Sequence, residues 1–445
     1  AGEQRLVQYS SLLVDIVFKG PPCFKQLRTA SGFDMDELDQ RLERAPSSLI
    51  ATALNRELLE LAVCPIVIRP IFFGARFVIV TAPALVAAAN DLAAHKIARG
   101  LSTVVVTTAT TGATAAGIRS YLQNAYNNWW IRPRYLLLMG DAELIPTHYP
   151  GANNSWDGVK NGGDQYYGQF GGGSTSVPLL GIGRFPVDTD AQAGRRRQGQ
   201  GLRERPAELL QCLLRQLQLR GAVQDDDTNG VENRTFARTA EVIRAHVAGL
   251  GWNVQRIYRD SPTTSPTTWY DGVAVPWYLR KPTFPWNGAT ADVTAAFNDG
   301  RALFFHRDHG WWNGWGTPGF STGNLAGVAV AGHEFPVVLS VNCASGIFDN
   351  EATETSGAGY SNAASVYWAE SFLRKADGAL AVIGDQRSSG STINSDLAKG
   401  LVDAIFPNLL AYGPATTVRR LGDVLNAGKG YLTSLGYGAA DQSRR

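Results

Sequence analysis

The sequence predicts an α/β protein with mostly parallel sheets in two subdomains, preceded by an N-terminal extension. Short apolar runs alternate with stretches of helical periodicity, which is the pattern of parallel strands covered by helices on both faces. The alternation occurs in each half of the chain, with about four strands per half. Apolar residues make up 44% of the 445 residues and charged residues 18%, so a large core can form.

Composition excludes several classes of protein. The formal net charge of +2 gives no field that would attract nucleic acid. The longest apolar stretch, 66–89, is interrupted by Arg69 and Arg76, so no transmembrane helix is expected. Four cysteines without a CxxC pair are too few for a disulfide scaffold. No signal peptide opens the chain at Ala1, which says little about its compartment.

The first half divides into an extension and a subdomain. Residues 1–75 are expected to be an N-terminal extension or propeptide-like segment containing two helices, 35–44 and 47–62. The first α/β subdomain spans residues 76–220. Its expected elements in order are a strand at 76–82, a helix at 83–99, a strand at 102–109, a helix at 111–129, and strands at 134–141 and 179–186.

The second subdomain is expected over residues 221–435, followed by a clipped C-terminal tail, 436–445. Helix and strand signals alternate along it, and Gly251 marks the end of its first helix. Its expected strands are 253–259, 302–310, 336–343 and 379–385, and its expected helices are 236–250, 290–297, 366–375, 395–405 and 418–425.

Residues 194–220 do not fit this alternation. These 27 residues include seven Arg and five Gln and contain no β-branched or aromatic side chain. One interpretation is an exposed amphipathic helix over 206–219. The other is a frame slip in a GC-rich coding sequence, because a one-base shift can restore a helix followed by an apolar strand. That hypothesis predicts that 194–220 is the least native-like part of the sequence.

Two polar triplets follow apolar strands in the second half. Asp308-His309-Gly310 comes after one strand and Asn342-Cys343-Ala344 after another. The carboxyl ends of parallel strands meet at one edge, and adjacent strands lie about 4.8 Å apart. His309 and Cys343 can therefore face one another, and an imidazole that accepts the thiol proton makes cysteine a nucleophile. The Gly310 amide could point toward a developing oxyanion.

Simpler interpretations of these residues remain open. A cysteine after a buried strand is often a small core residue, and a histidine there is often a hydrogen-bonded loop residue. His306, His309 and His333 could instead suggest zinc. Ligands at i and i+3 suit a helix, however, and on a strand they point to opposite faces, so zinc is not favoured.

The ordered set of motifs resembles the gingipain family of caspase-like (clan CD) cysteine peptidases. The resemblance covers about 80% of the chain, from Arg76 to Tyr431. The segments that carry it are 76–106 with YLLLMGDAELIP (135–146), GDQYYGQ (163–169), GIGRFPV (181–187), HGWWNGWG (309–316) and WAESFLRKADGALAVIGD (368–385).

The resemblance implies a caspase-like three-layer α/β/α sandwich with its site in the second subdomain. It makes Cys343 the nucleophile and His309 its proton-transfer partner, with His306 as a competitor. The amides of Gly310 and Cys343 would form the oxyanion hole. A supporting acid is implied at Asp225, with the neighbouring Asp226 and Asp227 as alternatives.

Substrate recognition is less directly implied. Strictly arginine-specific relatives carry an acid before the helix that here begins near Phe236, where the nearest acid is Glu232. The resemblance assigns the substrate-binding wall to Asp385 and Arg387, and Trp315 is a further candidate for substrate contact. A carboxylate in this wall would favour a basic P1 residue, the residue before the scissile bond.

The predicted function is hydrolysis of protein or peptide substrates through a Cys-His dyad and a thioacyl-enzyme intermediate. The alternative is a non-catalytic binding or adhesin module on the same scaffold. No cofactor is required for the chemistry. A structural calcium ion is suggested by the family and by Asp349, Asn350 and Glu351. The resemblance also implies a secreted or cell-surface bacterial protein.

Overall fold

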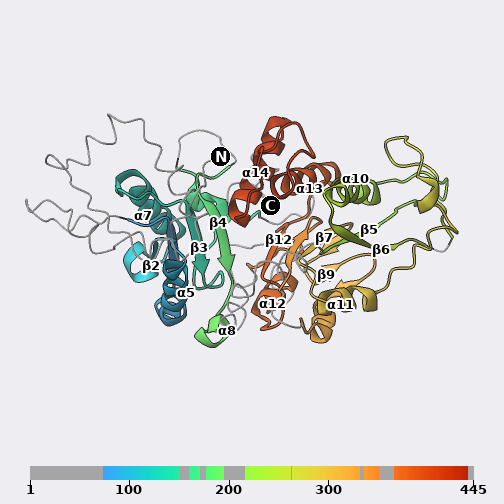
Figure 1. Cartoon of the computed structure of the whole chain (residues 1–445). Helices are drawn as coiled ribbons and strands as arrows, with labels where there is room; N and C mark the ends of the chain where they lie inside the picture. Colours follow the sequence, from blue (N-terminus) through green and yellow to red (C-terminus); the bar gives the residue numbers. More distant parts are fainter. Residues whose placement is uncertain are drawn as a thin grey trace, which may run out of the picture. The chain divides into compact units, whose positions relative to one another are not determined.

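The computed structural model describes residues 74–149, 160–170, 177–194, 216–261, 263–330, 335–349 and 365–438 (Figure 1). The expectations for residues 1–73, for 195–215 within the unusual segment, for His333, for Asn350 and Glu351, and for 439–445 lie outside the described residues. Nearly all of the described residues belong to one compact unit, Phe73–Lys96 with Ser102–Arg445.

The first sheet has four parallel strands in the order β2-β1-β3-β4. Its strands are β1 (Phe77–Thr81), β2 (Thr103–Thr107), β3 (Tyr135–Met139) and β4 (Gly181–Phe185). Their alternating side chains pack on both faces. Val78 and Val80 contact the side of α7 (Ala115–Asn128), while Ile79 packs with α5 (Val86–Ala98). Short helical turns η1 (Pro83–Leu85), α6 (Thr108–Thr111), η2 (Asp164–Gly168) and α8 (Asp190–Gly194) complete this part.

The second sheet has five parallel strands in the order β12-β11-β7-β5-β6. Its strands are β5 (Gln216–Ala222), β6 (Asn253–Arg259), β7 (Leu303–Arg307), β11 (Val337–Ser340) and β12 (Ala381–Gly384). The period-two alternation of buried side chains again separates two faces. Phe305 and Leu339 lie in one core cluster and Phe304 and Val338 in another.

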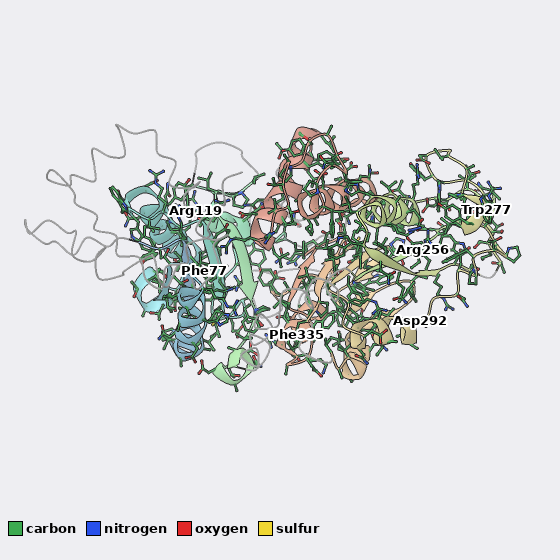
Figure 2. The ribbon with its side chains drawn as sticks, in the orientation of Figure 1. Phe77, Arg119, Arg256, Trp277, Asp292 and Phe335 are labelled. Carbon is green, nitrogen blue, oxygen red and sulfur yellow. The ribbon has the colours of Figure 1, made fainter. Side chains whose placement is uncertain are left out.

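Helices cover both faces of this sheet, and the side chains that fill the layers are drawn in Figure 2. The core that contains Phe305 is covered by α10 (Phe236–Gly249), α13 (Ser391–Ile405) and α14 (Leu421–Ser434). The core that contains Phe304 is covered by α11 (Thr290–Asn298) and α12 (Trp368–Arg374). The turn η4 (Trp277–Leu279) precedes α11 in the sequence, and the turn η5 (Thr322–Gly327) comes later in the chain and contributes Leu325 to the same core.

A small antiparallel sheet follows β7, made of β8 (Gly310–Trp311), β9 (Gly314–Trp315) and β10 (Phe320–Ser321). The strand expected over 302–310 therefore ends at Arg307, and residues after it turn into this hairpin. The helix expected over 418–425 instead runs from Leu421 to Ser434. It continues past Gly428 because that glycine packs closely on α13, where an added Cβ would lie 2.9 Å from Leu401.

Strand β5 crosses the expected boundary at residue 220 and belongs to the second sheet. Leu217 and Leu219 are buried in its core, so residues 216–219 are not the end of an exposed helix. A strand does occupy the place that the frame-slip hypothesis requires. The hypothesis itself stays a prediction, because residues 195–215 lie outside the described part.

Candidate active site

The register of the second sheet aligns the two predicted active-site segments. His306 on β7 pairs with Ser340 on β11, and the Val341 amide donates to the His306 carbonyl oxygen. His309 and Cys343 each lie three residues beyond that pair. The rule that parallel strands end at a common edge therefore places both segments at the same carboxyl edge.

The backbone around Cys343 is held tightly. Ala344 has a φ of 56°, which is in the left-handed region that side chains other than glycine rarely adopt. Its amide donates to the Arg387 carbonyl oxygen at 3.2 Å, and the Gly346 amide donates to that of Asp385 at 2.8 Å. These bonds tie the turn after Cys343 to the segment that follows β12, and the strain at Ala344 persists because the surroundings fix it.

The Cys343 thiol contacts Ser389. Its sulfur lies 3.5 Å from the Ser389 carbonyl oxygen and 3.9 Å from the Ser389 hydroxyl. Burial raises the pKa of this thiol, and the charge of Asp385 raises it further, while the hydrogen bonds of Ser389 and the charge of Arg307 act in the opposite direction. Cys343 is the cysteine that the structure describes, and it forms no disulfide.

The loop that carries His309 is fixed at its base by Asp308. The Thr317 amide donates to Asp308 Oδ2 at 2.7 Å, and the Gly316 amide donates to the His309 carbonyl oxygen at 2.9 Å. Burial raises the pKa of Asp308, and its backbone hydrogen bonds act against that rise. The hairpin therefore presents the exposed His309 side chain from a rigid backbone.

The His309 ring is oriented by Gln224, which lies just beyond β5. Nε2 of His309 is 3.0 Å from Oε1 of Gln224, and Nε2 of Gln224 donates to Asp226 at 2.7 Å. Because the Gln224 amide nitrogen is used by Asp226, its oxygen is left to accept from His309. This arrangement favours the tautomer with a proton on Nε2 and a lone pair on Nδ1. The edge of the ring also packs on Phe236, with centroids 5.1 Å apart.

Gly310 brings the loop that carries His309 against the segment that carries Cys343. A Cβ at Gly310 would lie 2.2 Å from Oδ1 of Asn342 and 2.9 Å from the Cys343 carbonyl oxygen. The two backbones therefore approach as closely as glycine allows. Within the described part of the chain, the Cys343 sulfur nevertheless hydrogen-bonds to Ser389 and not to His309.

His306 belongs to the core. It is fully buried, its Nδ1 lies 2.7 Å from Nδ2 of Asn342, and its ring stacks on Trp315 at 4.6 Å. Trp315 is 4% exposed and donates from Nε1 to the Ser340 hydroxyl at 2.7 Å. That burial argues against the substrate contact expected of Trp315. In the same hairpin, Trp311 is 46% exposed.

The carboxylate of Asp225 is used locally. It is buried and accepts from the amides of Asn229 at 3.1 Å and Gly230 at 3.0 Å. Asp226, one of the expected alternatives, reaches His309 only through Gln224. Sequence reasoning missed Gln224, although its place just after a buried strand is the same signal that singled out His309.

The two residues expected to line the substrate-binding wall are buried and bonded. Arg387 makes a two-pronged ion pair with Asp349, at 3.0 and 2.6 Å, and donates to the Lys160 carbonyl oxygen. Asp385 accepts from the Ser389 hydroxyl. The contacts of Arg387 favour a structural role, because its charge is already paired.

The remaining acidic residues are also engaged. Tyr149 donates to Asp349 at 2.6 Å, so both Asp349 oxygens have donors and Arg387 supplies positive charge. This argues against the calcium site expected at Asp349. Glu232 is buried and accepts from the Ala237 amide at 3.0 Å, at the start of α10, and burial raises the pKa of Glu232 to about 8.

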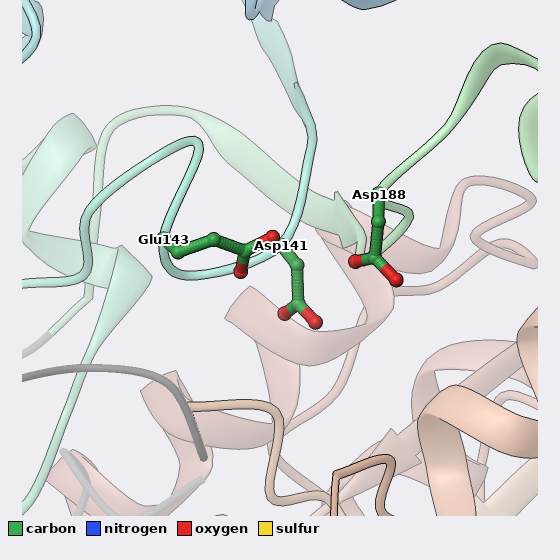
Figure 3. Close-up of side chains that lie close together, drawn as sticks. All are labelled: Asp141, Glu143 and Asp188. Carbon is green, nitrogen blue, oxygen red and sulfur yellow. The ribbon is translucent and has the colours of Figure 1, made fainter.

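A different acidic cluster lies at the carboxyl ends of β3 and β4 (Figure 3). Ligand oxygens of Asp141, Glu143 and Asp188 all lie within 4.8 Å of one another, so these residues could hold a metal ion. Arg374 donates to Asp141 and, at 2.7 Å, to Asp188. Its guanidinium therefore supplies positive charge to the cluster in the absence of any ion.

Comparisons with known proteins bear on the family and the fold of the chain. The model of peptidase family C25 matches residues 73–445. A crystal structure of the Arg-specific cysteine proteinase gingipain R (RgpB) is similar at a TM-score of 0.62 and 18% identity, covering 84% of this chain and 76% of that one. No curated protein sequence matches the chain.

Two further structures show the same likeness. The complex of the pro- and mature domains of Porphyromonas gingivalis RgpB has a TM-score of 0.59 at 18% identity, covering 83% and 77% of the two chains. A structure described as a protease has a TM-score of 0.60 at 16% identity, with coverage of 83% and 76%. These matches confirm the predicted caspase-like α/β fold with two parallel sheets. Because the family model covers most of its length, the chain belongs to peptidase family C25, the gingipain family.

Proposed function

We propose that the chain is a cysteine endopeptidase in which Cys343 is the nucleophile and His309 the proton-transfer group. One observation carries the proposal. In a chain of peptidase family C25, the loop of His309 and Gly310 lies against the Cys343 backbone at the carboxyl edge of β7 and β11.

The proposed reaction uses groups in these two loops. After the thiol turns from Ser389, Nδ1 of His309 accepts its proton and the sulfur bonds to the scissile carbonyl carbon. The carbonyl electrons move to the oxygen, which the amides of Gly310 and Cys343 would stabilise. The C–N bond then breaks, His309 protonates the leaving amine, and a thioacyl-enzyme forms. Water then loses a proton to His309 and attacks that thioester. Sulfur leaves as the acid product forms, and the proton returns to it from His309.

Orientation of the imidazole is the proposed task of Gln224. Its contact with His309, and its own bond to Asp226, support the tautomer that the reaction needs. Asp225 stays an alternative for the supporting acid. Its carboxylate accepts hydrogen bonds from the amides of Asn229 and Gly230 in the turn that follows it.

Substrate preference is a separate part of the proposal. The negative charge of Asp385 acts on Cys343, and the same charge would attract a basic P1 side chain. Arg387 is paired with Asp349, which does not favour acidic P1 recognition. Substrates are proposed to be proteins or peptides outside the bacterial cytoplasm, on the basis of family resemblance. In the described part of the chain, no helix is long and apolar enough to cross a membrane.

A non-catalytic binding module is the alternative, and the thiol's contact with Ser389 instead of His309 is the observation that favours it. A peptide library that varies the P1 residue, read by mass spectrometry, tests both. The wild-type chain should cleave and Cys343→Ala should not, with the same circular dichroism and melting temperature. Cleavage that persists in Cys343→Ala would contradict the assignment.

The same library tests the P1 assignment. Asp385→Ala should weaken cleavage after Arg and Lys, and Arg387→Ala should not create a new preference. An unchanged P1 ranking in both variants would mean that other residues read the substrate.

Calcium remains a proposal for the cluster of Asp141, Glu143 and Asp188, whose oxygen ligands suit a hard cation. Arg374 would have to share those carboxylates with the ion. A rise in melting temperature with calcium that is absent in Asp188→Asn would support such a site.

A further inference from the structure

Two oxygen atoms of Ser389 lie near the Cys343 sulfur. The Ser389 carbonyl oxygen, 3.5 Å away, can accept but never donate. The Ser389 hydroxyl, 3.9 Å away, can do either, so its single proton decides whether the sulfur meets a donor or an acceptor.

Asp385 and Asn394 determine where that proton lies. The Ser389 hydroxyl is within hydrogen-bond distance of the Asp385 carboxylate, and the side-chain amide of Asn394 donates to the hydroxyl oxygen at 2.8 Å. Asp385 and Asn394 are each 1% exposed, so water does not compete for these bonds. The Asn342 carbonyl oxygen, 3.3 Å from the hydroxyl, is a further acceptor. A hydrogen bond to a carboxylate is stronger than one to a neutral thiol or carbonyl, so the Ser389 hydroxyl donates its proton to Asp385. Both Ser389 oxygens are then left to accept from the S–H group.

We propose that Asp385 and Ser389 are positioning residues that hold the Cys343 side chain as a neutral thiol, turned toward Ser389, until substrate displaces it toward His309. The inference rests on the proposed function, because it describes how the same nucleophile is held before reaction. It differs from the usual arrangement of a cysteine nucleophile, in which a nearby imidazole takes the thiol proton in the resting state.

The charged groups around the thiol are consistent with this. Burial disfavours the thiolate most, and Asp385, which faces the thiol from the end of β12, adds to that effect. The hydrogen bonds of Ser389 and the charge of Arg307 on β7 favour the thiolate, but they do not reverse the rise in the pKa of the thiol. Arg307 is itself bonded to the Ser391 carbonyl oxygen and to Ser395, and its guanidinium lies over Phe236 at 4.4 Å. From the loop after β7, Asp308 is bonded to backbone amides and His309 to Gln224, so neither side chain bonds to the sulfur.

The test is the pH dependence of Cys343 alkylation in the full chain without substrate. Iodoacetamide is added from pH 5.5 to 10, and mass spectrometry follows the peptide that contains Cys343. N-acetylcysteine in the same buffers gives the reference midpoint. The wild-type midpoint should lie above that of N-acetylcysteine. A midpoint well below neutrality would overturn the proposal, since it would mean a resting thiolate.

The diagnostic variant is Asp385→Asn, which removes the charge but keeps an oxygen that can accept from Ser389. Its midpoint should fall. For each unit of that fall, the thiolate fraction at pH 7 rises about tenfold while its intrinsic reactivity drops about threefold, so alkylation should be about three times faster. The matched control is Asp396→Asn on α13, which makes the same change in charge where the carboxylate contacts Lys399 and Tyr437. Its midpoint should match the wild type.

An Asp385→Asn midpoint equal to that of the control would overturn the role of Asp385. If Asp385→Asn does not fold, the wild-type comparison with N-acetylcysteine still decides the protonation state. Peptide hydrolysis is measured on the same preparations. A shifted Asp385→Asn midpoint with no hydrolysis by the wild-type chain supports this inference and counts against the peptidase proposal, whereas hydrolysis by the wild type with an unshifted Asp385→Asn midpoint does the reverse.

Discussion

Replacement of Gly310 by alanine tests whether the loop that carries His309 must touch the segment of Asn342 and Cys343. The new methyl group would lie 2.2 Å from Oδ1 of Asn342, 2.5 Å from its Cγ, and 2.9 Å from the Cys343 carbonyl oxygen. Asn342 cannot simply swing away, because its amide nitrogen is bonded to His306 and to Ser340. One of the two backbones must therefore move.

The expected loss of stability is modest and the expected loss of activity is large. Forcing one extra methyl into a packed site costs about 1–3 kcal/mol. That cost lowers the melting temperature of a protein of this size by a few degrees. A displacement of about 1 Å between reacting groups can reduce the rate about 10²-fold. The value of kcat/KM should therefore fall by about two orders of magnitude in a chain that still folds.

The assay compares Gly310→Ala with Gly319→Ala. Gly319 lies in the same hairpin region, before β10, and an added Cβ there would meet its nearest neighbour, the Gly316 carbonyl oxygen, at 3.5 Å, which is ordinary contact. The control should keep wild-type kcat/KM and melting temperature. Gly310→Ala with unchanged kcat/KM would refute the reasoning, and equal losses in both variants would show only that the hairpin is sensitive to any substitution.

Three further outcomes are expected. Gln224→Leu should lower kcat about tenfold or more with little change in KM, because the ring of His309 loses its orienting partner; an unchanged kcat would remove Gln224 from the mechanism. Asp349→Ala should lower the free energy of unfolding by about 3–5 kcal/mol in urea titrations, because it leaves the charge of Arg387 buried and unpaired; a loss below about 1 kcal/mol would show that water reaches Arg387. Glu232→Gln should gain stability relative to the wild type as pH rises from about 5 to 8, since the pKa of Glu232 is raised to about 8 by burial and the unfolded chain releases its proton first. Parallel melting curves of the two proteins across this pH range would contradict that ionisation.

The alternation of apolar runs and helical periodicity was enough to predict the first sheet and the strands β6, β7, β11 and β12 of the second, but not β5 or the small antiparallel sheet. Parallel strands that are buried on both faces consist of almost continuous apolar residues, and such runs can be recognised in the sequence. The rule that parallel strands end at a common edge also predicted that His309 and Cys343 lie at the same edge of the sheet. That prediction needs only parallel pairing of the two strands. The register of His306 with Ser340 bears out that common edge.

Tertiary structure decided the partners of these residues, because they come from distant parts of the chain. Gln224 meets His309 across 85 positions and Tyr149 meets Asp349 across 200. Local periodicity carries no information about contacts of this kind. It also could not reveal that Trp315 is buried while Trp311 is exposed, although both lie in one short hairpin.

The protonation state of Cys343 also depends on contacts between distant parts of the chain. The sequence supplies a cysteine after a strand, and its chemistry depends on a few nearby oxygen atoms and on one buried carboxylate. Asp385 and Ser389 reach Cys343 only because β12 lies beside β11, with Gly384 in register with Ser340. Strand composition determined that a sheet would form, whereas the packing of one strand against its neighbour determined which charges the thiol meets.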